Sequence, residues 1–168
     1  VDMYVKIRDA LLMSPTWTYG AYLNYVQEVL NLVGAHKWRN KFREEDPNIA
    51  HLKNEQKILE AMTPVELASN DRLIFTKRAL TLIAEKAGVE EINVRNLLST
   101  HDSLRGDRRW YQIRKQFDRP LPEDAETREF LARQDRPLTD QEEIYIERMQ
   151  KKNAVGVKSQ NVTMLTKN

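Results

Sequence analysis

The spacing of apolar residues constrains the fold of this chain more than any other feature of its sequence. Apolar residues recur at intervals of three and four, and no stretch alternates convincingly between apolar and polar residues over the length of a strand. Glycine, which weakens helices, occurs only five times in 168 residues. The longest apolar stripe consists of Tyr22, Leu23, Tyr25, Val26, Val29, Leu30 and Val33. The pattern predicts an all-α protein, folded as a helical bundle without a sheet.

Turn and capping residues divide the chain into helices. Ser14-Pro15 closes a first helix over residues 4–12, and a second begins after Thr16 or Thr18 and ends at Gly34. A third helix is expected over residues 49–62. The sharpest helix start follows it, because Thr63 caps, Pro64 takes the first helical position and Glu66 completes a capping box.

Residues 83–98 have the spacing of a helix-turn-helix between helices expected over residues 73–87 and 91–103. The small Ala84 lets the helices approach, Gly88 makes the turn, and Leu97 locks the second helix to the core. Two packed helices without a ligand would show the same spacing, so both interpretations stay open. Either one predicts joint burial of Leu73, Ile83, Ala84, Val94, Leu97 and Leu98.

A basic segment, residues 105–119, follows this motif. It carries six cations against two acids, a net charge of +4, with Trp110, Tyr111 and Phe117 interleaved. Arginine binds phosphates and aromatic rings stack on bases, so the segment indicates contact with nucleic acid. The alternative is a solvated helix whose Trp110 and Phe117 are buried against the core.

The remainder of the chain is strongly charged. Residues 121–150 are acidic and predict one or two short helices, one of them capped at Thr139 and carrying Ile144. The last 18 residues have little pattern and are expected to form an extended or disordered arm.

Several classes of function lack the residues they need. Without cysteine there is no disulfide scaffold, thiol nucleophile or zinc ribbon. His36, His51 and His101 have no ligand-like spacing, and no phosphate-loop or nucleophile motif occurs. We therefore expect a protein that is not an enzyme and holds no metal or cofactor. No apolar run approaches the roughly 20 residues of a membrane span, so no membrane partner is expected.

The order of several segments resembles a known family. Ile58–Leu67, with its Met62-Thr63-Pro64 step, is followed by Asp71-Arg72-Leu73-Ile74, by Lys77-Arg78 and by the helix-turn-helix. This order resembles the M domain of the signal-recognition-particle GTPase over residues 16–115. The resemblance implies a helical domain whose helix-turn-helix binds RNA and whose methionine-lined groove takes signal sequences. The chain departs from the family in having fewer cations before the turn, only Met62 as methionine in that range, and no GTPase domain.

These observations predict three segments: an N-terminal helical extension (1–15), an M-domain-like bundle (16–115) and a charged C-terminal extension (116–168). We expect a structural subunit of a large ribonucleoprotein, a mitochondrial ribosome above all, that docks on ribosomal RNA and neighbouring proteins. The residues expected to contact RNA are Lys77, Arg78, Lys86, Arg95, Arg105, Arg108, Arg109, Arg114 and Lys115. A second contact is expected where the family has a flexible finger, at Lys37, Trp38, Arg39, Lys41 and Arg43, although Trp38 would equally serve as a structural anchor.

The expected location follows from this architecture. Long polar extensions are typical of subunits that become ordered on assembly. The chain begins with Val1 rather than Met, which a removed targeting peptide or an incomplete chain would explain. We expect a mitochondrial location, and otherwise a cytoplasmic one.

Two other functions stay open. A targeting factor that binds signal sequences would need an exposed apolar groove, which the low methionine content disfavours. A DNA-binding regulator would read bases through the helix that begins at Glu91, but Glu90 and Glu91 would then face phosphates.

Overall fold

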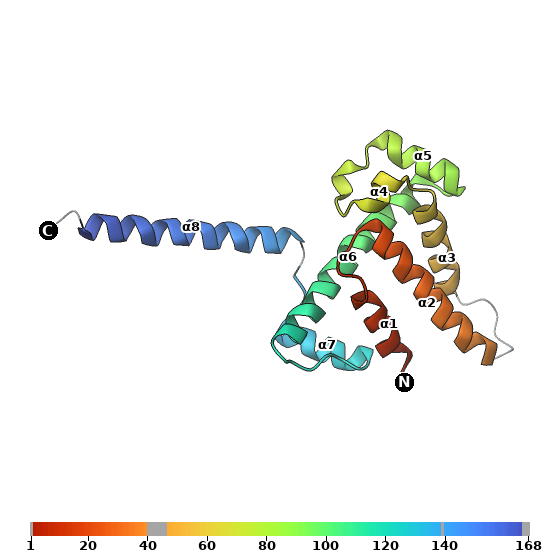
Figure 1. Cartoon of the computed structure of the whole chain (residues 1–168), viewed down its shortest axis with the longest axis horizontal. Coiled ribbons are helices and arrows are strands. Elements are labelled where there is room, and N and C mark those ends of the chain that lie inside the picture. The colour runs from red at the N-terminus through yellow and green to blue at the C-terminus, as the bar shows by residue number, and fades with distance from the viewer. Residues whose placement is uncertain (1, 40–46, 139, 166–168) are drawn as a thin grey trace.

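The computed structural model describes residues 2–39, 47–138 and 140–165, with side chains for all of these except 36–39, 140, 143 and 157–165. Within these ranges the protein is helical and has no strand, which confirms the all-α prediction (Figure 1). The helices are α1 (Met3–Leu12), α2 (Tyr19–Arg39), α3 (Pro47–Glu60), α4 (Pro64–Ala68), the 3-10 turn η1 (Arg72–Ile74), α5 (Lys77–Ala87), α6 (Glu91–Gln116), α7 (Ala125–Gln134) and α8 (Asp140–Leu165).

The core lies between α2, α3, α5 and α6, and α1 packs against α2 and α6. Its largest fully buried side chains include Tyr19, Tyr22, Ile58, Leu59 and Leu97. Leu11 from the first predicted segment belongs to this core, and Leu131 of α7 packs against it from the last. The packed unit therefore draws residues from all three predicted segments.

Two predicted helix ends are wrong. Gly34 does not end the second helix, since α2 continues to Arg39. The helix that begins at Glu91 continues past Ser103 to Gln116, so the basic segment is its second half. It continues because its inward face stays buried, and it ends where Asp118 adopts a left-handed conformation with φ of 50°, two residues before Pro120.

The prediction that Leu73 is buried is also wrong, because its side chain is 86% exposed. A 3-10 turn, η1, occupies this stretch, and α5 begins only at Lys77. Its N-cap is Thr76, whose hydroxyl accepts a hydrogen bond from the Ala79 N–H. The buried position is taken by Phe75 instead.

The C-terminal part differs from the expected arm. Helix α8 extends away from the bundle, and its helical range includes residues 151–165, which were expected to be extended or disordered (Figure 1). Every side chain described between residues 144 and 156 is exposed, so local helix propensity rather than packing accounts for this helix. The expected cap, Thr139, lies outside the described residues.

Candidate nucleic-acid interface

The predicted helix-turn-helix is formed by α5, Gly88 and α6. Ala84 is 5% exposed in the core, and its carbonyl accepts the Val89 N–H at 3.0 Å. Gly88 has a left-handed φ of 70°, which a residue with a side chain adopts at a cost. Val94 and Leu97 are buried behind the turn, as predicted.

The cations expected on this motif lie on its surface. Lys77, Arg78, Lys86 and Arg95 are all exposed. Arg95 forms an ion pair with Glu91 at 2.8 Å, one turn before it on α6. An exposed pair of this kind contributes little to stability and leaves the guanidinium accessible to a phosphate.

The second half of α6 divides the remaining predicted cations between surface and interior. Arg109 and Lys115 are exposed. Arg105 is 29% exposed, pairs with Asp102 at 3.7 Å and donates to the Asn70 carbonyl. These three side chains therefore reach the surface, Arg105 only in part.

Arg114, in contrast, is buried and acts within the fold. Its Nε donates to the Pro120 carbonyl at 2.9 Å, its Nη1 lies 3.2 Å from Asp135, and its guanidinium lies over the Trp110 ring. These contacts hold the chain after α6 and the end of α7 against α6. The expectation that Arg114 contacts RNA is corrected, because its donors are turned inward.

The aromatic side chains of the basic segment are likewise placed inside. Trp110 and Tyr111 are each 4% exposed, and the Trp110 indole N–H donates to Asp135. They cannot stack on a base without unfolding. The alternative predicted for Trp110, burial against the core, is what the structure shows, whereas Phe117 is 63% exposed.

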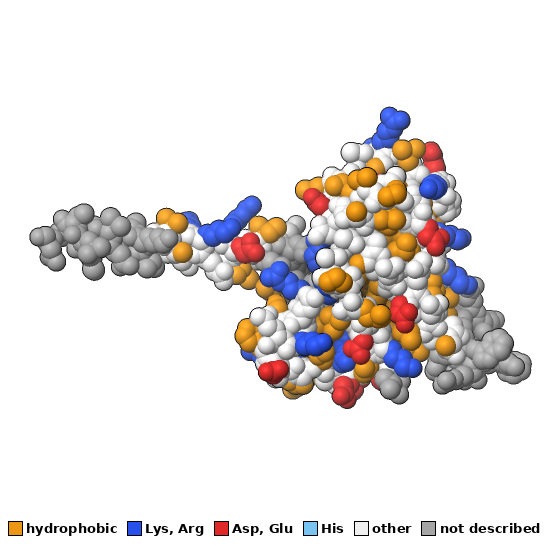
Figure 2. Space-filling model, in the orientation of Figure 1, with side chains coloured by type: hydrophobic (Ala, Val, Ile, Leu, Met, Phe, Trp, Pro, Cys, Tyr) orange, Lys and Arg blue, Asp and Glu red, His pale blue; other side chains and the backbone are white. Residues whose placement is uncertain are grey.

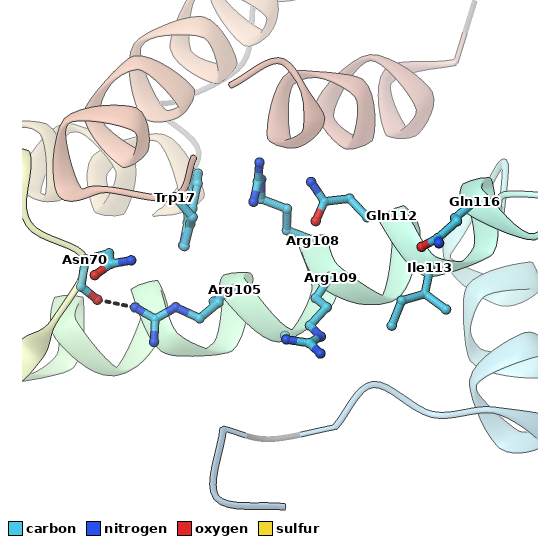
Figure 3. Close-up of a pocket in the computed structure, with 9 residues that line it drawn as sticks. Trp17, Asn70, Arg105, Arg108, Arg109, Gln112, Ile113 and Gln116 are labelled. Carbon is cyan, nitrogen blue, oxygen red and sulfur yellow. Dashed lines mark hydrogen bonds between the residues drawn. The ribbon is translucent and has the colours of Figure 1, made fainter. Parts of the chain in front are cut away.

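An open pocket of about 410 Å³ runs along α6 beside these residues (Figure 3). Its lining contains three guanidinium groups, three carboxamides and no carboxylate. We call it the arginine groove, and its walls are Trp17, Asn70, Arg105, Gly106, Arg108, Arg109, Gln112, Ile113 and Gln116.

A second pocket, of about 580 Å³, provides a contrast. Its charged residues include Asp107, Arg128 and Arg136. Here Arg128 contacts Asp107 at 2.6 Å, and Arg136 contacts Glu142 of α8 at 3.0 Å. The cations of this pocket are therefore neutralised within the protein.

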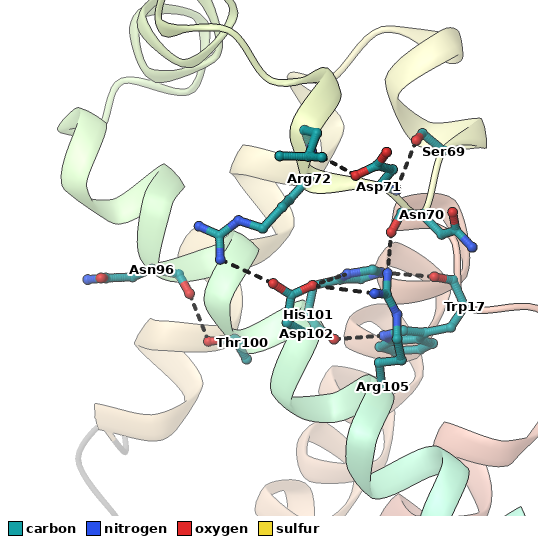
Figure 4. A network of polar contacts seen from close by, with 11 residues as sticks. Trp17, Ser69, Asn70, Asp71, Arg72, Asn96, Thr100, His101, Asp102 and Arg105 are labelled. Atoms are coloured by element: carbon teal, nitrogen blue, oxygen red, sulfur yellow. Dashed lines mark hydrogen bonds and ion pairs between the residues drawn. The ribbon is translucent and has the colours of Figure 1, made fainter. Parts of the chain in front are cut away.

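A polar network holds the end of the arginine groove that is lined by Trp17, Asn70 and Arg105 (Figure 4). The Trp17 indole N–H donates to the His101 carbonyl, and the His101 Nε2–H donates to the Trp17 carbonyl, both at 2.9 Å. Asp102 pairs with Arg72 at 3.1 Å and with Arg105. Burial lowers the pKa of His101 from 6.5 to about 4, so the ring is neutral at physiological pH.

Sequence reasoning missed Trp17, Asn70 and His101 as parts of this site. One signal was present: Val94, His101 and Arg108 follow one another at intervals of seven, which places them on one face of a helix. The core position of Val94 therefore indicates that His101 and Arg108 also face inward. No comparable signal identifies Trp17 or Asn70, which come from distant segments.

Some expectations fall outside this site. The second predicted contact, Lys37, Trp38, Arg39, Lys41 and Arg43, lies outside the residues whose side chains are described. Among the side chains that the structure describes, no group of three or more potential ligands could hold a metal ion. Within the described ranges, none of the helices has the length and apolar character needed to cross a membrane.

No model of a known protein family matches the chain, and no curated protein sequence matches it. The M-domain relationship thus stays a prediction from the sequence.

Proposed function

We propose that this protein is a non-catalytic RNA-docking subunit of a large ribonucleoprotein, and in the narrowest form of the proposal a mitochondrial ribosome. The observation that carries the proposal is the arginine groove, whose lining combines three arginines with amide side chains and no acid. Guanidinium and amide groups donate hydrogen bonds to phosphate and sugar oxygens, the contacts that position a protein on a nucleic acid.

The exposed cations of the helix-turn-helix extend this surface. Arg95 and Arg109 are 14 residues apart, close to four helical turns, and so lie near the same face of α6. The rise of an α-helix separates them by about 21 Å along the axis. One nucleic acid can therefore contact both ends of α6, provided that it spans this distance.

Helix α8 supports the assembly part of the proposal. It extends away from the bundle and exposes Ile144, Tyr145 and Met149. Apolar side chains on an isolated helix become buried when a neighbouring protein packs against them, which suits a subunit that contacts several components.

Charge reversal at surface positions tests the proposal. We compare Arg109→Glu with Lys115→Glu, made together, against the control pair Lys6→Glu and Arg133→Glu, whose exposed side chains lie on α1 and α7. Nucleic acid cross-linked to each protein in cells is captured and sequenced, and affinity for the recovered RNA is measured against salt. The variant with both Arg109→Glu and Lys115→Glu should lose most of its RNA and flatten the log–log salt slope by about 1.4, at roughly 0.7 per contact.

The control pair should retain its RNA and its slope. Equal losses in both pairs, or no loss in either, would refute RNA docking through this surface. Recovery of DNA instead of RNA would favour the DNA-binding alternative.

One observation favours a second candidate, a targeting factor that binds apolar peptides. Val65 of α4 and Leu73 of η1 are 77% and 86% exposed. In Figure 2, hydrophobic side chains gather over the part of the bundle where Figure 1 places α4 and α5. This candidate predicts that Val65→Ser together with Leu73→Ser abolishes cross-linking to a signal-sequence peptide, while RNA capture is unchanged.

A further inference from the structure

Arg108 is a buried cation without a carboxylate partner among the residues that the structure describes. Its side chain is 8% exposed, and the hydrogen bond it makes is to a neutral group, the Ser14 carbonyl, at 2.5 Å from Nη2. Its Nε is enclosed and has no hydrogen-bond partner. Burial lowers the pKa of Arg108, and no nearby acid opposes this effect. A buried charge is costly unless it is paired, so this position favours an anion.

The space next to Arg108 suits an anion. Arg108 forms part of the wall of the arginine groove, between Arg105 and Gln112 (Figure 3). Arg109 brings a third positive charge into the same wall. Arg114, which is buried to a similar extent, has the Asp135 carboxylate at 3.2 Å.

We infer that the arginine groove binds the phosphate groups of an RNA backbone, with Arg108 supplying the buried charge and Arg105 and Arg109 the direct contacts. This inference rests on the proposed function and adds the chemical class that the groove recognises. A phosphodiester offers unesterified oxygens with one negative charge, which arginine binds through paired N–H groups.

The groove has few means of reading bases. Trp17 is the aromatic side chain in its lining, but it is 4% exposed and stacked on His101, with ring centroids 5.4 Å apart. Its indole N–H is also engaged, by the His101 carbonyl. Without an accessible ring, recognition falls to charge and hydrogen bonding along the backbone.

The length of the groove fits more than one nucleotide. Arg105 and Arg109 are one turn apart on α6, or about 6 Å, and the lining continues to Gln116, about 16 Å from Arg105 along the axis. Successive phosphates of an extended strand can therefore meet successive side chains of the helix.

The first experiment measures the melting temperature of the full chain in sodium phosphate and in sodium chloride of equal ionic strength. Phosphate should raise the melting temperature of the wild type above its value in chloride. The response should disappear in Arg108→Met, which removes the buried charge, and survive in part in Arg108→Lys. Arg109→Gln should also reduce the response to phosphate. Because Arg109 is exposed, this variant tests the groove even if the Arg108 variants fail to fold. Arg133→Gln on α7 is the matched control and should respond like the wild type.

The second experiment measures binding of oligouridylate and oligoadenylate of equal length. Both should bind with the same affinity within a factor of about three, because bases are not read. Both should weaken in Arg109→Gln, with the log–log salt slope lower by about 0.7. A strong preference for one base, or unchanged binding and phosphate response in Arg109→Gln, would overturn the inference.

The two experiments separate this inference from the proposed function. If cells yield bound RNA but phosphate has no effect on the wild type, the protein docks on RNA elsewhere and the groove assignment is wrong. If phosphate stabilises the protein through Arg108 but neither oligonucleotide binds, the anion site stands as a free-phosphate site and the RNA-backbone assignment is wrong.

Discussion

His101 should make the stability of this protein sensitive to acid. Its side chain is fully buried, and its ring stacks on Tyr19 with centroids 4.1 Å apart. Because a carbonyl only accepts hydrogen bonds, Nε2 must carry the proton that is donated to Trp17. Protonation would therefore occur at Nδ1, which is buried without a hydrogen-bond partner and lies 3.8 Å from the nearest Asp102 oxygen.

The size and sign of the effect follow from the pKa of His101. Burial, with a smaller contribution from Arg105, lowers it from 6.5 to about 4, against the opposing effects of the Trp17 carbonyl and Asp102. As the pH falls below 6.5, His101 becomes protonated in the unfolded chain but stays neutral in the folded protein until the pH approaches 4. The folded state therefore loses stability relative to the unfolded state. Each pH unit costs about 1.4 kcal/mol, and the total approaches about 3 kcal/mol at pH 4, below which the effect levels off.

Urea denaturation of the wild type and of His101→Gln at several pH values tests this prediction. Glutamine retains an amide N–H for the Trp17 carbonyl but does not titrate in this range. Other groups contribute to both proteins alike. Glu55, whose pKa burial raises, favours the folded state as the pH falls, and this contribution cancels in the comparison.

The free energy of unfolding of the wild type should therefore fall relative to His101→Gln by about 3 kcal/mol between pH 7 and pH 4. Parallel curves for the two proteins over this interval would show that His101 is not held neutral in the folded state, and would refute the reasoning.

Three further predictions concern the fold, each measured by urea or thermal denaturation. Ala84→Leu should destabilise the protein by about 1–3 kcal/mol, because the added methylenes force α5 and α6 apart; an unchanged stability would contradict their contact at this position. Asp135→Asn should lower the free energy of unfolding by about 2 kcal/mol, since it removes the charge that faces buried Arg114. Asp124→Asn, at the exposed cap of α7, is the control, and an equal loss of stability in both variants would show that the Arg114–Asp135 pair is solvated. Thr63→Ala should cost about 1 kcal/mol by removing the hydroxyl that accepts the Glu66 N–H of α4, whereas Thr63→Ser should retain most of the stability.

The features predicted correctly are those that depend on neighbouring residues. The capping box is present, with the Thr63 N–H donating to Glu66 at 2.8 Å. Gly88 adopts the left-handed turn expected of it. The all-α fold followed from the spacing of apolar residues, since a period near 3.6 commits a segment to a helix before any partner is known.

Two of the errors share one cause, which is that the direction a helix faces depends on what packs against it. The basic segment was expected to turn its arginines outward. Two of them point inward instead, since Arg108 donates to the Ser14 carbonyl and Arg114 pairs with Asp135. Leu73 was predicted to lie in a helix and in the core. The chain forms the turn η1 there instead, so Leu73 is exposed and Phe75 is buried. In both cases composition was informative about the segment as a whole, and only packing distinguished one side chain from the next.

The amino-acid sequence by itself determined that the chain is helical and where the capping box at Thr63 and the turn at Gly88 lie, because caps, turns and apolar spacing act within a few residues. Only the tertiary structure decided which cations are available to a ligand. Trp17, Asn70 and Arg108 are distant in sequence and line one groove because α6 brings them together. A charge has the same sign wherever the chain places it, but its partner and its solvation are set by residues from other segments, and these became known only with the fold.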